Sequence, residues 1–255
     1  MGLKTASAVF CRYVDRILGS MKFETVLPYL DDLLLFSKTP EEHLGVCERL
    51  FKQLGKFNMT LGAKKCTFFA KSVGFLGHVV DTNGIRTDPA KIKAISSWEL
   101  PTSHKEMESA LGLFAYYRRF LPGYSKLEKP LREKLTHPAQ WKKKAGAIVY
   151  TDAERTAFYR IRDALSAEPV LAHPDWSAPW ELHCDAAYAG GLGAVLSQRI
   201  DGVEKVISYA SRAITSTEAN YSVWELECLA IVWATRLFRM YLTGAKFKVR
   251  LQLTS

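Results

Sequence analysis

Long apolar runs are missing from this sequence of 255 residues. No stretch approaches the roughly 20 apolar residues that a membrane helix needs, and the N-terminus lacks the pattern of a secretory signal. Cysteine is also scarce, because the five cysteines are odd in number and form no CxxC pair. The pattern excludes a disulfide framework and predicts reduced thiols in an intracellular protein, cytoplasmic or nuclear, without a membrane segment.

The charge balance is strongly basic, with 35 Lys and Arg against 26 Asp and Glu and a formal net charge of +9. A surplus of this size favours a polyanionic partner, nucleic acid first, and weakens the case for an enzyme of small metabolites. Hydrophobic residues make up 48% of the chain and charged residues 24%, as in ordinary globular proteins. The length suffices for one large domain or two to three small ones.

Two adjacent aspartates stand between two apolar runs in the stretch YLDDLLLF, residues 29–36. Apolar runs of strand length around a short polar break predict a β-hairpin with Asp31 and Asp32 at its tip. Two explanations of the pair stay open. Aspartate suits turns because its side chain can bond its own backbone, and two fixed negative charges can also hold a metal ion.

Periodicity and capping signals predict the other elements. The sequence predicts helices up to Gly19 and over 40–57, short strands at 59–62 and 66–70, and a hairpin over 73–88 turned at Asn83-Gly84. Helix starts are expected at Asp88-Pro89 and at capping boxes that begin at Ser103, Thr151 and Ser222. Three strands over 178–212 and a last strand from 246 complete an α+β pattern.

A second carboxylate pair is expected in the C-terminal part. Asp185 ends a predicted strand, and Glu227 lies in the first turns of the long helix that follows. If this helix packs across the sheet, the two carboxylates can form a two-metal platform for phosphodiester hydrolysis, with the oxygen ligands that magnesium prefers. The alternative is structural: an aspartate in a turn, and a glutamate favoured by the helix dipole.

Seven stretches, in chain order, resemble those of one family: YLDDLLLFSKTPEEHL, FLGHVVDTNGIRTDPAKIKAI, LGLFAYYRRFLPGYSKLEKPL, PVLAHPDW, GLGAVLSQ, ISYASRAIT and NYSVWELECLAIVWATRLFRMYLTG. Over almost its whole length the chain resembles the Pol polyprotein of gypsy-class long-terminal-repeat retrotransposons. The resemblance implies an α+β, multidomain chain. Its parts would be the C-terminal part of a reverse transcriptase palm (1–86), a helical thumb (87–136), a connection (137–176) and an incomplete RNase H-like α/β domain (177–255).

The resemblance also implies functions for particular residues. The family pairs an RNA-directed DNA polymerase with a nuclease for RNA·DNA hybrids, uses two-ion Mg²⁺ sites, and binds RNA/DNA template-primers or hybrids. Tyr29 to Asp32 match its YxDD motif, in which the aspartates bind magnesium and Tyr29 lines the template-primer. Asp185 and Glu227 match the first two RNase H carboxylates. Further nucleic-acid contacts are implied for Phe75, Leu76, Gly77, His78, Tyr117, Arg118 and Arg119, and nucleotide contacts for Gly2 and Lys65.

Both implied metal sites are incomplete in this sequence. The polymerase needs a third aspartate, on a strand before the helix that begins at Gly2. RNase H needs two more aspartates, and the first would stand where this chain has the neutral Gln252. The fourth would lie beyond Ser255. A two-ion site with half its ligands holds magnesium poorly, so we expect little or no activity from this chain alone.

Two other functions stay open at this stage. The first is a non-catalytic nucleic-acid-binding remnant of the same element, with binding that weakens steeply with salt. The second is an intracellular zinc-binding module that uses His43, Cys47, Cys66 and His78. His43 and Cys47 are one helical turn apart, but the overall spacing matches no standard zinc pattern.

Overall fold

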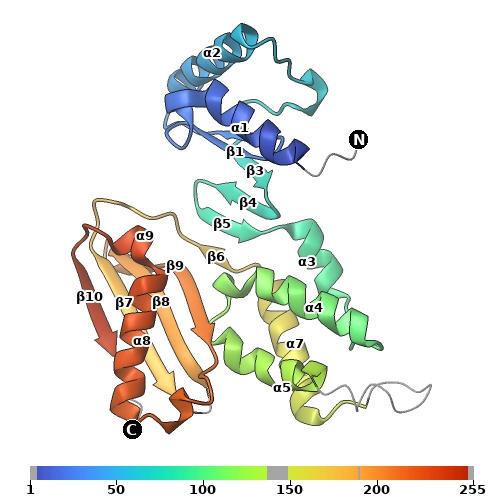
Figure 1. The fold of residues 1–255 in the computed structure, drawn as a ribbon, viewed down its shortest axis with the longest axis vertical. Helices are drawn as coiled ribbons and strands as arrows, with labels where there is room; N and C mark the ends of the chain where they lie inside the picture. The colour runs from blue at the N-terminus through green and yellow to red at the C-terminus, as the bar shows by residue number, and fades with distance from the viewer. Residues whose placement is uncertain (1–4, 137–148, 189, 252–255) are drawn as a thin grey trace. The chain divides into compact units, whose positions relative to one another are not determined.

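Capping residues fix many of the element boundaries in this chain, which we describe from a computed structural model. The structure describes residues 5–136, 149–188 and 190–251. Its contacts divide the chain into two units, residues 1–75 and 76–255 (Figure 1). Mixed helix and sheet in both units agree with the α+β prediction.

The first unit packs two helices against a short hairpin. The first helix ends at Gly19, whose φ of 51° lies in the left-handed region, and the second begins at Thr39, whose hydroxyl accepts the Glu42 N–H. Its core comprises Val14, Ile17, Leu18, Met21, Val26, Val46, Leu50 and Leu54. The elements are α1 (Ala6–Leu18), η1 (Gly19–Met21), β1 (Val26–Tyr29), β2 (Asp32–Leu35), α2 (Pro40–Lys56), η2 (Ala63–Lys65) and β3 (Ser72–Phe75).

Two strands predicted in this unit are wrong. Residues 59–62 and 66–70 have no strand structure, and only the single turn η2 lies between them. A strand needs a partner to satisfy its backbone hydrogen bonds, and no strand of the described structure pairs with these residues. Phe68 and Phe69 are accordingly exposed.

The second unit begins with a small sheet and a helical layer. β4 and β5 form the predicted hairpin, although the residues between the paired Asp81 and Gly84 are Thr82 and Asn83 rather than Asn83-Gly84. β6 pairs antiparallel with β5, and the helices pack around Phe114, Phe158 and Ile161. The elements are β4 (His78–Asp81), β5 (Gly84–Thr87), α3 (Pro89–Ser96), α4 (His104–Tyr116), η3 (Arg118–Phe120), α5 (Tyr124–Thr136), α7 (Asp152–Ser166) and β6 (Val170–Leu171).

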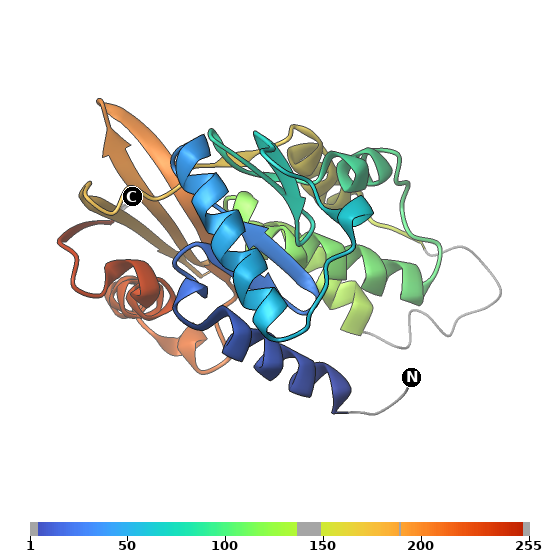
Figure 2. The ribbon, with the colours of Figure 1, turned by 90° about the horizontal axis from the view of Figure 1, so that it is seen from above.

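A four-stranded sheet with the order β10-β7-β8-β9 completes the second unit. The meander β7-β8-β9 is antiparallel, whereas β10 pairs parallel to β7 after the crossover through α8. α8 lies along one face of this sheet (Figure 1) and is seen end-on in the view from above (Figure 2). The elements are β7 (Trp180–Ala187), β8 (Gly191–Ile200), β9 (Val203–Arg212), η4 (Glu218–Asn220), α8 (Val223–Leu237), α9 (Arg239–Leu242) and β10 (Phe247–Leu251).

Two physical properties bear on the expected setting of the protein. Within the described residues, no helix has both the length and the apolar character that a membrane crossing requires. All five cysteines are free thiols in the structure.

Candidate functional site

The hairpin β1-β2 places both aspartates at its tip. Tyr29 pairs with Asp32, so the connecting residues are Leu30 and Asp31. Leu30 has a φ of 54°, a left-handed conformation that is strained for a residue with a side chain. Asp31 and Asp32 are both exposed, and Tyr29 is 52% exposed. The predicted hairpin is therefore present, and it directs two carboxylates toward solvent.

The structure shows little about the two residues for which nucleotide contacts are implied, Lys65 and Gly2. Lys65 ends the single turn η2 and is exposed, with no ion pair inside the described part of the chain. Gly2 lies outside the described residues. Their role remains a prediction.

A cluster of aromatic and basic residues forms where β4 meets the helical layer. The rings of His78 and Tyr116 stack with centroids 5.3 Å apart and planes inclined by 8°. The Tyr116 O–H donates to the Leu76 carbonyl, and the Tyr117 O–H donates to the Gly77 carbonyl at 2.7 Å. The segment Leu76 to His78 thus lies against Tyr116 and Tyr117, about 40 residues later in the chain.

Exposure separates the roles of the two tyrosines. Tyr117 is 0% exposed, so its hydroxyl supports the Leu76-Gly77 turn from inside the protein. Tyr116 is 46% exposed and is the ring that faces solvent. The sequence reasoning also missed Lys91, whose Nζ lies 5.7 Å from the centroid of the Tyr116 ring. The sequence signal at Asp88-Pro89 predicts the start of a helix. It does not indicate that Lys91 of this helix will contact Tyr116, 25 residues later in the chain.

This aromatic and basic cluster is electropositive. Burial, together with the positive charges of Arg119 and Lys91, lowers the pKa of His78. Its Nδ1 atom and the Arg119 Nε atom are buried without hydrogen-bond partners. Arg118 is exposed beside them, and Phe75 is half-buried at the end of β3. The exposed Arg118 guanidinium and the exposed Tyr116 ring are the groups of this cluster that suit contact with a phosphate backbone.

The second carboxylate pair is formed by β7 and α8. Asp185 lies near the end of β7, opposite Gly193, and Glu227 lies on the face of α8 that covers the sheet. The capping box of Ser222 and Glu225 fixes the start of α8 and thereby the direction in which Glu227 points. Glu227 is only 4% exposed.

The charged forms of these two carboxylates are electrostatically unfavourable in the folded protein. Burial and the negative charge of Asp185 raise the pKa of Glu227, against the Ala186 backbone N–H, which lowers it. Burial and the charge of Glu227 raise the pKa of the Cys184 thiol to about 11. The Asp185 Oδ1 and Glu227 Oε2 atoms are buried and accept no hydrogen bond from protein atoms. A positive charge beside these two carboxylates would therefore stabilise their ionised forms.

A divalent cation would fit this donor set. Hard cations take oxygen ligands, and the two orphaned carboxylate oxygens offer such ligands side by side. Within the described residues, however, no group of three or more His, Cys, Asp or Glu lies close enough to hold a metal ion. The pair therefore supplies only part of a coordination shell, and Gln252, the position at which a further carboxylate was expected, lies outside the described residues.

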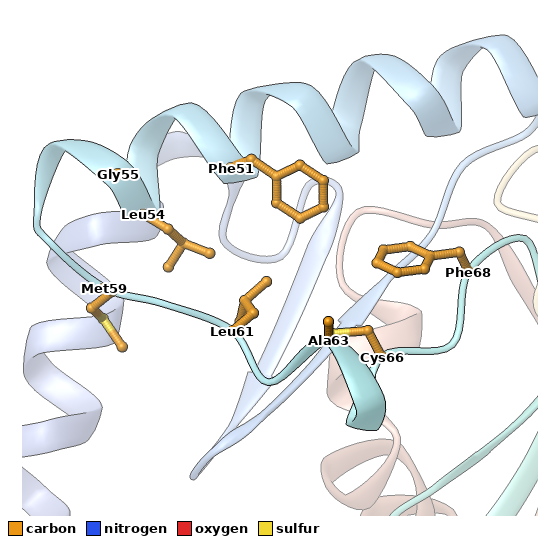
Figure 3. A pocket seen from close by; sticks show the side chains of 8 residues that line it. All are labelled: Phe51, Leu54, Gly55, Met59, Leu61, Ala63, Cys66 and Phe68. Carbon is orange, nitrogen blue, oxygen red and sulfur yellow. The ribbon is translucent and has the colours of Figure 1, made fainter.

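The structure does not support the zinc alternative. Among the described residues, no three of His43, Cys47, Cys66 and His78 lie close enough together to hold a metal ion. The ring of His43 instead pairs with the Ser37 hydroxyl, and Cys47 is buried in α2. Cys66 lines an apolar pocket with Phe51, Leu54 and Phe68 (Figure 3). The Cys47 thiol is therefore a packing group, and the Cys66 thiol donates to the Gly62 carbonyl at 3.5 Å.

Comparisons with known proteins match both halves of the chain. Residues 1–80 match the family model of reverse transcriptase (RNA-dependent DNA polymerase), and residues 150–249 match that of the RNase H-like domain found in reverse transcriptase. The fold is similar to that of the foamy viral protease-reverse transcriptase, in complex with an RNA/DNA hybrid and in complex with dsDNA. The TM-scores are 0.79 and 0.81, at 24% identity over 100% of this chain and 33% and 52% of those chains.

Three retrotransposon proteins show the relationship in sequence. The Retrovirus-related Pol polyprotein from transposon 297 of Drosophila melanogaster is 39% identical over 97% of this chain. Those from the transposons opus and gypsy of the same organism are 37% and 34% identical, each over 96% of this chain. The chain spans 22%, 25% and 24% of the lengths of these three polyproteins, respectively. The chain therefore belongs to the Pol polyproteins of gypsy-class retrotransposons and carries their reverse transcriptase and RNase H-like sequences.

Proposed function

We propose that this chain binds RNA/DNA template-primers and hybrids and takes part in RNA-directed DNA synthesis and in cleavage of the RNA strand. Asp31 and Asp32 would serve nucleotide addition, and Asp185 and Glu227 would serve hybrid cleavage. Each pair would hold Mg²⁺ as part of a larger ligand set. The four-part division at 86, 136 and 176 and an intracellular location belong to the same proposal, and protein partners remain open.

The observation that carries the proposal is the geometry of Asp185 and Glu227. A carboxylate with a raised pKa beside a second carboxylate, both with unsatisfied buried oxygens, is costly for the fold alone. A bound divalent ion would offset both charges and polarise a phosphodiester. The protein's own contribution is to hold the two carboxylates on rigid elements, a central strand and a capped helix, so that a phosphodiester meets a fixed pair.

Nucleic acid as the partner is supported by separate observations. The formal net charge is +9, and the surface formed by His78, Tyr116, Lys91 and Arg119 combines cations with an exposed ring. Aromatic and cationic groups together suit a sugar-phosphate backbone. The similar foamy viral structures contain an RNA/DNA hybrid or dsDNA.

The experiment is an incubation of the purified chain with an end-labelled RNA·DNA hybrid that carries a recessed DNA primer, nucleotides and Mg²⁺. Primer extension above an Asp31→Asn control would support the polymerase role, and RNA cleavage above an Asp185→Asn control would support the nuclease role. Each variant serves as the other's control, because each removes one carboxylate from one pair and leaves the other pair intact. Absence of both products rejects catalysis by this chain.

A second function, binding without catalysis, is favoured by Gln252. This neutral amide stands where the family resemblance places a carboxylate, and a site with fewer charges attracts magnesium less strongly. Under this function the hybrid still binds without product, and binding weakens steeply between about 50 and 200 mM salt as counterions compete. Under it, Asp31→Asn leaves hybrid binding intact or slightly stronger, since one negative charge is lost. No binding at low salt, or binding that does not respond to salt, would contradict both functions.

A further inference from the structure

An exposed tryptophan lies at the opposite end of β7 from the carboxylate pair. Trp176, in the loop before β7, is 67% exposed. One face of its ring stacks on Tyr241, with centroids 6.0 Å apart and planes inclined by 11°, and its edge meets Trp180 at 5.7 Å. Trp180 itself is 1% exposed, so Trp176 and Tyr241 form the outer layer of a three-ring stack.

A buried glutamine holds this loop in place. Gln198 of β8 is 0% exposed and accepts the Asp175 N–H at 2.8 Å. Its amide group donates to the carbonyls of Asp175 at 2.6 Å and Ala178 at 3.1 Å. The Asp175 carboxylate in turn accepts from the Ser177 N–H and hydroxyl. The backbone on both sides of Trp176 is therefore anchored in the sheet, and the ring is held outward before any ligand arrives.

Packing within the protein does not account for this arrangement. A tryptophan stabilises a fold by the apolar area that it removes from water, and a ring that is 67% exposed removes little. A fixed ring with one free face is, by contrast, what a planar ligand needs. Nucleobases stack on such rings without regard to sequence, because every base has a π-face.

The charges around the three rings favour a polyanion. Arg239 begins α9, the turn that carries Tyr241, and the Lys246 carbonyl accepts from the Trp180 N–H. Lys248 follows on β10. All three cations are exposed, and within the described residues none of them has an ion-pair partner. Asp175 is the one acid of residues 172–179, and its carboxylate is engaged by Ser177.

We propose that Trp176 and Tyr241 form a stacking platform for an unpaired base of single-stranded nucleic acid, with Arg239, Lys246 and Lys248 beside its phosphates. The platform is separate from the carboxylate pair and does not depend on catalysis. It deepens the proposed function, since it gives the chain a place for a single strand in addition to a duplex.

The test measures the affinity of the chain for three labelled probes by fluorescence anisotropy: a 12-nucleotide single-stranded RNA, the same sequence as DNA, and a blunt RNA·DNA hybrid. Trp176→Ala should weaken binding of a single strand by about 5- to 150-fold, as loss of one stacked base does, and leave hybrid binding unchanged. Trp176→Phe keeps a ring and should stay within about threefold of the wild type. The RNA and DNA arms show which strand the platform prefers.

Trp224→Ala is the matched control. Trp224 is 72% exposed on α8, and no other ring of the described structure stacks on it. Its loss should leave single-strand binding unchanged. Lys246→Glu tests the charge independently and should weaken single-strand binding while both rings remain. The platform would be overturned if Trp176→Ala bound single strands as well as the wild type, or if Trp176→Ala and Trp224→Ala lost the same affinity, even if the hybrid still binds. The exposed Trp176 ring would then be explained as a contact for a partner protein.

Discussion

Replacing Glu227 with glutamine should stabilise the protein when no divalent ion is present. The carboxylate is 4% exposed, and burial together with Asp185 raises its pKa. A raised pKa means that the folded state holds the proton more tightly than the unfolded state. The free energy of unfolding is therefore highest below the ordinary glutamate pKa of 4.5 and falls as the pH rises through the folded-state pKa. Glutamine keeps the shape of the side chain and removes this loss.

The size of the effect follows from burying a negatively charged, unsatisfied oxygen beside Asp185, since glutamine carries no charge there. A buried polar group without a partner costs about 1–3 kcal/mol. We therefore expect Glu227→Gln to add about that much to the free energy of unfolding at pH 7.5 in EDTA. For a unit of this size the melting temperature should rise by about 2–4 °C per kcal/mol. Mg²⁺ at ten times its dissociation constant should stabilise the wild type by about 1.4 kcal/mol and leave the variant unchanged.

The assay is thermal unfolding followed by circular dichroism at pH 5 and pH 7.5, each in EDTA and in Mg²⁺. The difference between variant and wild type should shrink at pH 5, where Glu227 holds its proton for a larger share of the time. Glu225→Gln is the control, because Glu225 is two residues away and its carboxylate accepts from the Ser222 N–H and hydroxyl, both at 2.8 Å. These bonds hold its pKa below the usual range, so its replacement should lower stability at pH 7.5 or leave it unchanged, with and without Mg²⁺, and should not raise it. A Glu227→Gln protein that melts below the wild type in EDTA would refute the reasoning.

Three further outcomes are expected. Gly77 has a φ of +67°, and in Gly77→Ala the new Cβ would lie 2.9 Å from Lys91 Nζ and 3.3 Å from the Tyr116 hydroxyl. This substitution should therefore weaken template-primer binding in anisotropy titrations and lower the free energy of unfolding by about 1 kcal/mol. Arg212 holds the pKa of Glu218 at about 2, so this pair stabilises the fold above pH 4.5 and progressively less as the pH falls through 2. Arg212→Lys should lower the free energy of unfolding in urea by about 1 kcal/mol at pH 7 and by less at pH 3. Tyr150→Phe removes the 2.7 Å bond to the Pro101 carbonyl inside the helical layer and should cost about 1–2 kcal/mol in the same urea assay, with no effect on nucleic-acid binding.

Elements that depend on local contacts were predictable from the sequence. The capping boxes of Thr151 and Ser222 form as predicted, because the bonds that make them join residues three positions apart. Between β8 and β9, Asp201 and Gly202 both have positive φ values, which these residue types adopt more readily than most others. The hairpin tip at Asp31 and Asp32 follows from the apolar runs on either side of it.

Features that depend on contacts between residues far apart in the chain were not predictable from the sequence. Apolar residues at 59–62 have the composition of a strand, but no partner strand exists for them in the described structure. Tyr117 was assigned to a nucleic-acid surface, yet it is buried beneath Gly77, 40 residues away, and Tyr116 takes the exposed position. The pairing of Asp185 with Glu227 could be expected only if the helix crossed the sheet, a condition that the sequence alone does not set. The strain in that pair comes from burial, which no local pattern encodes.

The carboxylate pair and the aromatic platform together set a length requirement on the nucleic acid. Trp180, beneath the platform, and Asp185 are five residues apart on β7, which corresponds to about 17 Å at about 3.3 Å per residue. At a stacked rise of about 3.4 Å per nucleotide, about five nucleotides span that distance. Hybrids with a single-stranded tail should therefore gain affinity over blunt hybrids once the tail passes about five nucleotides, and Trp176→Ala should abolish the gain. Anisotropy titrations with tails of zero to ten nucleotides measure the threshold. A gain that grows evenly with each nucleotide, in the wild type and in Trp176→Ala alike, would instead reflect charge along the whole surface, and the two sites would then act separately.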